Sequence, residues 1–332
     1  MRAPPLSVIM SVHNDAPFLR AAVESVRAQT FADFEFLIVD DGSTDGSAAI
    51  LDRAAASDPR IRVITQENRG LIASLNRLVA EARAPLLARM DGDDICLPDR
   101  FARQLDFMRA HPDHGVVGTW ATCIDSNDRP IGNCGERPET HEGMIANLRD
   151  GPLFCHPSVI MRRDLVEAVG GYHAAYRYAE DYDLWLRLST CTRFHNLTER
   201  LILYRHSDGQ VSTRHHVRQL INAAISWEAH LEREAGRTDP TDRLAELPGL
   251  DGVDALFGRP SVAAAIRERV VRAILYSPAA LRGDGYDLLI DHVSRDGKGA
   301  GGLWRTAGRL VKMGEPARAL RLAAALTFAK AA

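Results

Sequence analysis

Three carboxylates lie within four residues in the segment Asp91-Gly-Asp-Asp94. The apolar residues 85–90 come directly before it and predict a short buried strand. Carboxylates this close repel one another unless a cation lies between them. Hard oxygen ligands favour Mg²⁺ or Mn²⁺, which also bind phosphate oxygens. An acidic, solvated turn is the alternative interpretation, because such turns are common in proteins.

A second acidic pair, Asp40 and Asp41, follows the apolar residues 34–39 and precedes Gly42 and Ser43. An ionised carboxylate accepts hydrogen bonds and donates none, so it suits recognition of an N–H group on a ligand. The same two residues also fit turn and helix-cap chemistry at the end of a strand. The pair is therefore a second candidate for ligand binding.

The elements that would position these acids alternate in type over the first 125 residues. Strand patterns occur at residues 6–12, 34–39, 61–65, 86–90 and 116–124. Helical patterns occur at residues 16–29, from Ser43 or Thr44 to about 56, at 71–79 and at 98–110. This order predicts an α/β fold with a mostly parallel, Rossmann-like sheet and helices on both faces. Such sheets bind ligands at the carboxyl ends of their strands, so both acidic groups would face one crevice.

The regular alternation of strand and helix patterns ends at about residue 125. Residues 125–138 are rich in Gly, Pro, Asn and Asp and predict a loop, whereas residues 157–161 and 194–204 are strand-like. Helices are expected at about 163–169 and 182–188, and the chain is largely helical from about His215. We therefore expect one domain over residues 1–214, with halves that meet near residue 125. A helical C-terminal region of unknown role would cover residues 215–332.

The composition argues against several classes of protein, among them nucleic-acid-binding, disulfide-rich and membrane-spanning proteins. The 332 residues carry a net charge of −3, which lacks the basic footprint of a nucleic-acid-binding protein. The five cysteines are scattered without a C-x-x-C pair, which predicts neither a disulfide framework nor a zinc site and fits a reducing compartment. The N-terminus has no secretory pattern, and no apolar run approaches the roughly 18–20 residues that cross a bilayer. The expected location is cytoplasmic.

Several motifs follow one another in a recognisable order. They are Ser7-Val-Ile-Met-Ser-Val-His-Asn14, Leu37-Ile-Val-Asp-Asp-Gly-Ser-Thr-Asp45, Asn68-Arg-Gly-Leu71 with Asn76 in the next helix, Asp91-Gly-Asp-Asp94 with Leu97-Pro-Asp-Arg100, His156-Pro-Ser158 and Glu180-Asp-Tyr-Asp-Leu-Trp-Leu-Arg187. Together they resemble glycosyltransferase family 2, whose members have the GT-A fold and use nucleotide-sugar donors. The resemblance covers roughly residues 5–210.

The resemblance implies a set of residues for the donor. Ser11 would lie near a pyrimidine base, and Asp41 would accept a hydrogen bond from the imide N–H of that base. Asp93 would bind Mg²⁺ or Mn²⁺ directly, with Asp91 nearer the ribose or a metal-bound water. Arg69 is placed where a cation could approach the diphosphate, and a solvated loop charge is its other interpretation.

The resemblance also implies an acceptor side. Asp181 matches the family's catalytic base, which removes a proton from the acceptor hydroxyl as that hydroxyl attacks the anomeric carbon. Glu180 would orient the acceptor or a loop, and His156 faces the same side. Helix capping is the alternative role for Asp181 and Glu180, and loop packing is the alternative for His156. His206 would complete the shell of the metal or contact the diphosphate.

Two departures from the family pattern bear on the substrate. Polymer-building members carry a Q-x-x-R-W motif and membrane spans, whereas this chain has Gln210-Val-Ser-Thr-Arg214 without tryptophan. The resemblance therefore implies transfer of a single sugar. The basic segment 303–330 has two interpretations, a peripheral contact with an anionic membrane or a helical pair packed on the protein.

The resemblance as a whole implies a metal-dependent, inverting glycosyltransferase. Its donor would be a UDP-sugar or dTDP-sugar, its acceptor a glycan or a lipid-linked glycan, and its setting surface polysaccharide assembly. A nucleotidyltransferase would want a glycine-rich, basic loop after the first strand, and residues 12–18 contain neither glycine nor lysine. A non-catalytic nucleotide-binding or sugar-binding scaffold would have no need for Asp181.

Overall fold

The computed structural model describes residues 3–134, 136–151, 153–206, 215–296 and 300–329. It divides into two compact units, one of residues 1–174 and 180–210, the other of residues 175–179 and 211–332. The boundary that we expect after residue 214 lies outside the described residues, as does the Gln210–Arg214 segment. The assignment of residues 175–179 to the second unit has no counterpart in the sequence analysis.

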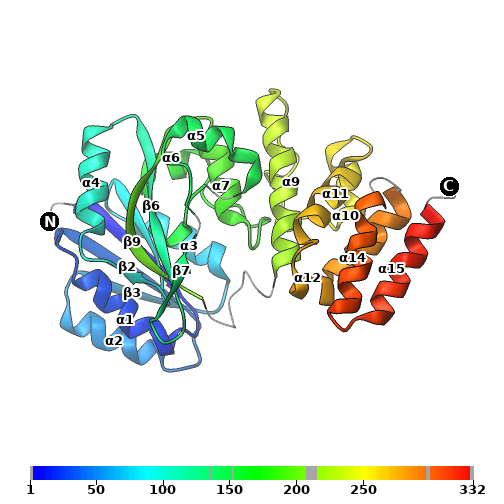
Figure 1. The fold of residues 1–332 in the computed structure, drawn as a ribbon. Helices are drawn as coiled ribbons and strands as arrows, with labels where there is room; N and C mark the ends of the chain where they lie inside the picture. The colour runs from blue at the N-terminus through cyan, green and yellow to red at the C-terminus, as the bar shows by residue number, and fades with distance from the viewer. Residues whose placement is uncertain (1–2, 135, 152, 207–214, 297–299, 330–332) are drawn as a thin grey trace. The chain divides into compact units, whose positions relative to one another are not determined.

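Four parallel strands form one half of the sheet in the first unit (Figure 1). Their order across the sheet is β3-β2-β1-β4, and their bounds are Leu6–Val12 (β1), Phe34–Asp41 (β2), Ile61–Gln66 (β3) and Leu86–Asp91 (β4). All eight residues of β2 are buried, which explains the uninterrupted apolar residues at positions 36–39. The predicted α/β fold is confirmed in this half.

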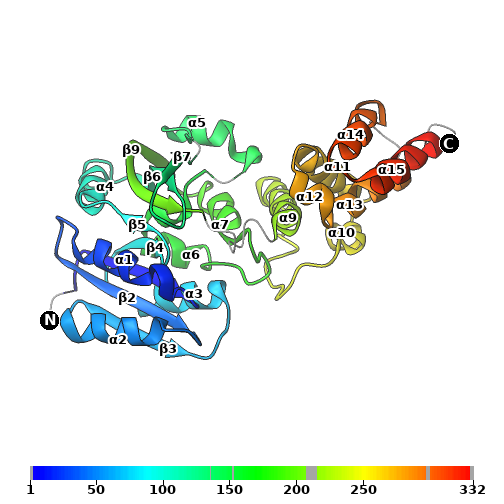
Figure 2. The same cartoon turned by 60° about the horizontal axis from the view of Figure 1, so that its bottom comes forward.

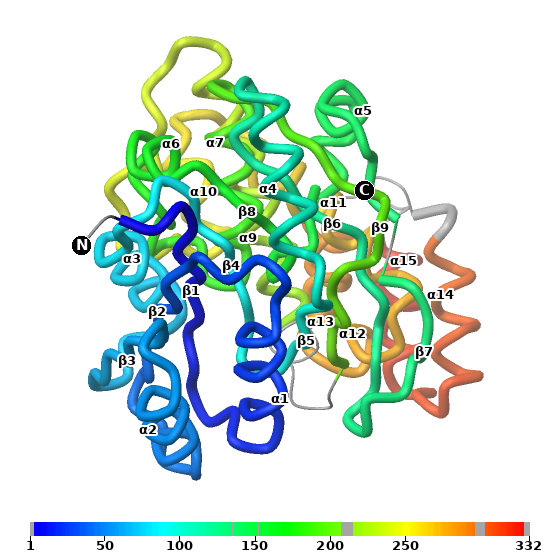
Figure 3. Tube along the Cα trace, turned by 90° about the vertical axis from the view of Figure 1, so that its left-hand side faces the viewer, coloured from blue at the N-terminus to red at the C-terminus, as the bar shows by residue number. Residues whose placement is uncertain are grey.

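The other half of the sheet mixes strand directions. Strand β8 (Ile160–Arg162) runs antiparallel between β4 and β6 (His114–Ile124), and β6 pairs in parallel with β9 (Arg193–Arg205). Figure 3 shows β6 and β9 side by side, with β7 next to β6. The sequence analysis missed β5 (Ile95–Cys96) and β7 (Pro130–Asn133). Strand β5 has only two residues, and every residue of β7 is exposed, so neither shows a hydrophobic pattern.

Helices surround this sheet (Figure 2). Their bounds are Ala16–Arg27 (α1), Ser47–Ser57 (α2), Leu71–Glu81 (α3), Arg100–Ala110 (α4), His141–Ala146 (α5), Arg163–Ala168 (α6) and Glu180–Leu188 (α7). Helix α2 begins later than the expected cap at Ser43 or Thr44, because Asp45 accepts a hydrogen bond from the Ser47 amide at 2.9 Å. Helix α4 likewise begins after Pro98, not at it.

The apolar faces of these helices and strands pack together to form the hydrophobic core of the first unit. Leu19, Val23 and Val26 of α1 are buried, as their spacing predicts, and so are Leu75 and Leu78 of α3. Each such side chain contributes about 1.5–3 kcal/mol when it leaves water. The core fixes the carboxyl ends of the strands, and with them the polar residues that follow.

The second unit is helical and has its own core. Its main helices are His216–Glu234 (α9), Leu250–Phe257 (α10), Val262–Ile274 (α11), Pro278–Arg282 (α12), Gly285–Asp291 (α13), Ala300–Lys312 (α14) and Pro316–Ala329 (α15). Tyr176 joins this unit through a hydrogen bond of 2.8 Å between its hydroxyl and Thr241 Oγ1. Across the described parts of the chain, no helix combines the length and the apolar character that a membrane span requires.

Candidate active site

The acidic motif lies where β4 ends and the turn to β5 begins. Asp91 is the last residue of β4, and Asp93 and Asp94 follow in the turn. One oxygen atom from each of the three carboxylates lies within 4.8 Å of the others. The three acids that sequence spacing singled out therefore gather as one group.

The closeness and burial of these carboxylates raise the pKa values of two of them. Burial, and next the charge of Asp91, raise the pKa of Asp93 to about 6. Burial, and next the charge of Asp93, raise the pKa of the buried Asp94 well above its ordinary value. Both shifts follow first from burial and then from the neighbouring carboxylates, so ionisation of the whole group is unfavourable without an added positive charge. An oxygen-rich site with excess negative charge fits a hard divalent cation such as Mn²⁺ or Mg²⁺.

A buried arginine, Arg89, accompanies the group, and the sequence analysis missed it. Arg89 is 4% exposed and precedes Asp91 on the same face of β4. Its Nη2 lies 2.5 Å from Oδ1 of Asp91, whereas its Nε and Nη1 find no hydrogen-bond partner among the described residues. The sequence did contain a sign of this residue's role, namely an arginine inside an otherwise apolar strand. Such a charge is rarely buried unless a counter-ion lies beside it.

Asp15 is a fourth carboxylate that the sequence analysis missed. It lies just beyond β1, and burial followed by the charge of Asp93 raises its pKa to about 7. A Cβ atom added at Gly92 would come within 2.6 Å of Oδ2 of Asp15, so glycine permits the close approach of the two loops. Its position shortly after β1, at the same edge of the sheet as Asp91 at the end of β4, was the available signal.

Arg205 holds the turn that carries Asp93 and Asp94. This residue ends β9, and its side chain is 1% exposed. Its backbone amide donates to Oδ1 of Asp94 at 2.8 Å, and its Nε donates to the carbonyl oxygen of Asp93 at 2.7 Å. Asp94 therefore orients the loop through the backbone of Arg205.

The carboxylate of Asp41 already accepts hydrogen bonds from other groups of the protein. Its Oδ1 accepts from Nε2 of Gln66 at 2.7 Å and from the amide of Arg69 at 2.8 Å, and its Oδ2 accepts from the amide of Gly70 at 2.8 Å. These hydrogen bonds lower the pKa of Asp41, although burial opposes them as the largest effect. Asp40 serves the turn instead, because it accepts from the amide of Ser43 at 3.0 Å. A role for Asp41 at a nucleotide base stays a prediction.

Ser11 and Arg69 lie near these acids. Ser11 pairs with Val39 of β2 and with Asp91 of β4 in the sheet register, and it is half-buried. The side chain of Arg69 is exposed and makes no hydrogen bond or ion pair with another described residue, so it is available to an anion. Both positions agree with the donor side that the resemblance implies, and neither role is tested by the structure.

Asp181 is the second residue of α7. Its Oδ1 accepts a hydrogen bond from the amide of Tyr182 at 2.7 Å, and burial raises the pKa of the carboxyl group. A carboxyl with a raised pKa is a stronger proton acceptor once it is ionised. Glu180 begins the same helix and is buried.

His156 packs near α7 through two aromatic side chains. Its Nε2 lies 3.0 Å from the hydroxyl of Tyr172, and its ring meets Trp185 of α7 edge to face at 6.0 Å. Burial lowers the pKa of His156 well below its ordinary value, so the imidazole is neutral. Asn76 fixes Tyr172 by a pair of hydrogen bonds to its backbone, at 2.7 and 2.8 Å. Tyr172 had no place in the sequence analysis, because nothing in its spacing links it to His156.

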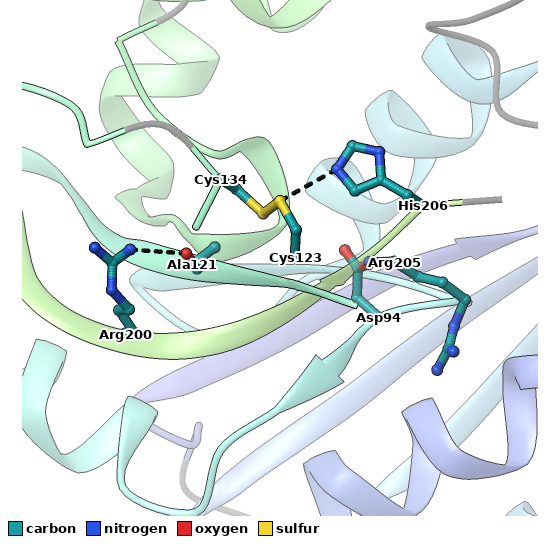
Figure 4. The surroundings of a disulfide bond; sticks show 7 residues. All are labelled: Asp94, Ala121, Cys123, Cys134, Arg200, Arg205 and His206. Atoms are coloured by element: carbon teal, nitrogen blue, oxygen red, sulfur yellow. Dashed lines mark hydrogen bonds between the residues drawn. A yellow bond between two sulfur atoms is a disulfide. The ribbon is translucent and has the colours of Figure 1, made fainter. Parts of the chain in front are cut away.

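His206 lies next to two cysteines (Figure 4). Cys123 and Cys134 form a disulfide, and Nε2 of His206 lies 3.2 Å from Sγ of Cys123. The expectation that the cysteines stay unpaired is wrong for these two, because the pairing of β6 with β7 brings them together. One ring nitrogen of His206 and the two sulfur atoms lie within 4.8 Å of one another, but sulfurs joined in a disulfide are not thiolates and do not offer a metal site. A role for His206 at the donor's metal stays a prediction.

Comparison with known proteins agrees with this geometry. Residues 7–170 match the model of "Glycosyl transferase family 2". The putative glycosyltransferase EpsE of Bacillus subtilis is 34% identical over 68% of this chain and 82% of its own length. The O-antigen biosynthesis glycosyltransferase WbnJ of Escherichia coli is 33% identical over 60% of this chain and 79% of its own length.

A solved structure supports the fold. The mannosyltransferase PcManGT from Pyrobaculum calidifontis, in complex with GDP-Man and Mn²⁺, aligns with a TM-score of 0.50 at 17% identity. The alignment covers 98% of this chain and 87% of that one. The sheet with its flanking helices is thus the GT-A arrangement that the resemblance implies. The chain belongs to glycosyl transferase family 2.

Proposed function

We propose that this protein transfers one sugar from a nucleoside-diphosphate sugar to a glycan or lipid-linked acceptor, with inversion at the anomeric carbon, in the assembly of a surface polysaccharide. The observation that carries the proposal is the group of Asp91, Asp93 and Asp94 at the end of β4 in a chain that also presents Asp181 on α7. The similarity to WbnJ, an O-antigen biosynthesis glycosyltransferase, supports the setting.

The donor side would use the carboxyl ends of β1, β2 and β4. Asp91 and Asp93 would hold a divalent cation, which when bound supplies positive charge to the departing diphosphate. Ser11 and Asp41 would face the base, and the exposed side chain of Arg69 would approach the diphosphate. We favour UDP or dTDP as the nucleotide, on the pyrimidine contact that the family resemblance implies.

The acceptor side would use α7. Asp181 would take the proton of the acceptor hydroxyl while that oxygen forms a bond to the anomeric carbon and the bond to the diphosphate breaks. One displacement of this kind inverts the anomeric centre. The neutral His156, hydrogen-bonded to Tyr172, would pack the wall of this side and not serve as the base.

The same residues give less support to two other functions. A nucleotidyltransferase would need basic, glycine-rich backbone after β1, and the structure instead places Asn14 and the acidic Asp15 there. A non-catalytic binding scaffold gives no reason to bury the Asp181 carboxyl at a cost to its ionisation.

A panel of donors tests the proposal. Purified protein is incubated with UDP-, dTDP- and GDP-sugars, and hydrolysis of the donor and thermal stabilisation are measured with Mn²⁺ and with EDTA. We expect a UDP- or dTDP-sugar to give the largest stabilisation, and only with Mn²⁺. The Asp93→Asn variant should lose this effect, whereas Asp52→Asn, an exposed acid on α2, should keep it. Stabilisation that survives EDTA would contradict the proposed metal role.

A further inference from the structure

A disulfide lies on the β6–β7 hairpin, in a group of side chains separate from the carboxylates of the donor side. It joins Cys123 of β6 to Cys134, which directly follows β7. Cys123 is buried and Cys134 is half-buried, and the imidazole of His206 reaches Sγ of Cys123 (Figure 4). The other three cysteines are free, namely Cys96, Cys155 and Cys191.

Backbone hydrogen bonds hold this hairpin together in addition to the disulfide. Strands β6 and β7 pair through Thr122 with Asn133 and through Cys123 with Gly132. The amide of Cys134 also donates to the carbonyl of Ala121 at 3.2 Å. Because this pairing does not pass through the sulfur atoms, we expect the hairpin to keep its strand register when the bond is opened.

The turn of this hairpin is connected to the donor-side loop through Arg205. Nη1 of Arg205 donates to the carbonyl of Asp125 at 2.9 Å, and its Nη2 lies 2.6 Å from Oδ1 of Asp128. The same guanidinium holds the carbonyl of Asp93, and the Arg205 amide holds the carboxylate of Asp94. One buried side chain thus bridges the β6–β7 turn and the acidic loop.

We propose that Cys123 and Cys134 form a reversible thiol–disulfide site, opened by a dithiol reductant, and that its state sets the affinity of the acidic loop for the donor. The first half of this proposal stands on the cysteines and His206 alone. The second half rests on the proposed function, because it uses the nucleotide as its readout.

The exchange can be written with its atoms balanced. A thiolate of the reductant attacks Sγ of Cys134, the more accessible sulfur, and the electron pair of the S–S bond leaves with Sγ of Cys123. His206, in the tautomer that carries Nε2–H, donates a hydrogen bond to the departing thiolate and stabilises it. The second thiolate of the reductant then attacks the mixed disulfide and releases Cys134. The protein gains two electrons and two protons, and the reductant becomes a cyclic disulfide.

Differential alkylation tests the exchange. The protein is equilibrated in dithiothreitol buffers of increasing reducing strength, and free thiols are tagged and located by peptide mass spectrometry. We expect Cys123 and Cys134 to become tagged together, and to be protected again after reoxidation. Cys191, exposed and free, should be tagged throughout and serves as the internal control. Thiols at 123 and 134 that are tagged in every buffer, or in none, would overturn the site.

The kinetics of reduction test the part played by His206. We expect the His206→Ala variant to be reduced about three- to tenfold more slowly than the wild type, because the leaving thiolate loses its hydrogen bond. His111→Ala, which removes an exposed histidine from the end of α4, should be reduced at the wild-type rate. Equal rates for both variants would remove His206 from the proposal.

Nucleotide affinity tests the coupling. We expect the oxidised protein to bind UDP with Mn²⁺ about three- to tenfold more tightly than the reduced protein, and Cys134→Ser to match the reduced form. Circular dichroism confirms that all three are folded. Equal affinities would overturn the coupling. If no form binds UDP, dTDP or GDP, the proposed function fails, while the alkylation result still decides the thiol–disulfide site.

Discussion

The carboxylate of Asp41 accepts a hydrogen bond of 2.8 Å from the backbone amide of Gly70, and so ties the end of β2 to the loop that begins α3. Gly70 has a φ of +85°, a conformation that glycine adopts without strain. Arg69 and Gln66 donate to the same carboxylate. Asp41 therefore shapes the loop that would border the nucleotide, whether or not it touches the base.

A substitution at Asp41 should therefore affect binding and stability together. We expect Asp41→Asn to lower UDP affinity about tenfold or more, since a hydrogen bond to a charged group contributes about 1.5–3 kcal/mol. The melting temperature should also fall, because an amide group cannot accept from all three donors. Calorimetry measures the first effect and thermal unfolding the second. Unaltered affinity with a lowered melting temperature would leave Asp41 a loop-positioning residue only.

The raised pKa values of Asp93 and Asp15 predict a pH-dependent metal effect. Each carboxyl has a folded-state pKa above its ordinary value, about 6 and about 7, so the folded protein retains protons that the unfolded chain releases. Their contribution to stability is present at low pH and is lost as the pH rises through these values. A cation binds the ionised form and opposes this loss.

The measurement compares melting temperatures in Mn²⁺ and in EDTA between about pH 5.5 and pH 8. We expect the difference to grow with pH and to level off above about pH 7.5. The Asp93→Asn variant should show a small difference at every pH. A Mn²⁺ effect that is constant over this range would mean that neither carboxyl contributes to the cation site.

The contact between Gly92 and Asp15 predicts a cost for the smallest substitution. An added Cβ would lie 2.6 Å from Oδ2 of Asp15, closer than van der Waals contact allows. We expect Gly92→Ala to destabilise the protein by about 1–3 kcal/mol, as overpacking does in other tight sites. Gly308→Ala, in α14 with no atom within 4 Å of the new Cβ, should not destabilise it.

The double variant Gly92→Ala with Asp15→Ala separates the clash from other effects. Removing the carboxylate should restore part of the lost stability, because the nearest clashing atom is gone. Denaturant unfolding of the four proteins gives the coupling free energy. Strict additivity of the two changes would show that the loops rearrange without contact between these residues.

Local patterns were enough to predict the parallel half of the sheet and the acidic motif. Strand β2 is buried along its whole length, so its apolar run is visible in the sequence, and Asp91 and Asp93 are only two residues apart. The link from Arg205 to Asp94 spans 111 residues, and nothing in the spacing of either residue reveals it. The same holds for Cys123 with Cys134, because the exposed strand β7 that aligns them carries no hydrophobic pattern.

The final prediction concerns the proposed base. Asp181→Asn keeps an oxygen that can accept from the amide of Tyr182, and it removes the cost of burying a charge, so the melting temperature should hold or rise. Transfer should fall by about 10²–10⁴-fold, the usual contribution of general-base catalysis. UDP affinity should barely change.

In the wild type, the raised pKa of Asp181 should place the acid limb of the kcat/KM profile above the ordinary range of an aspartate, with activity lost as the pH falls through that value. Glu180→Gln is the matched control and should keep most of the activity. If Asp181→Asn transfers sugar at nearly the wild-type rate while Glu180→Gln does not, the base is Glu180, and Asp181 only caps α7.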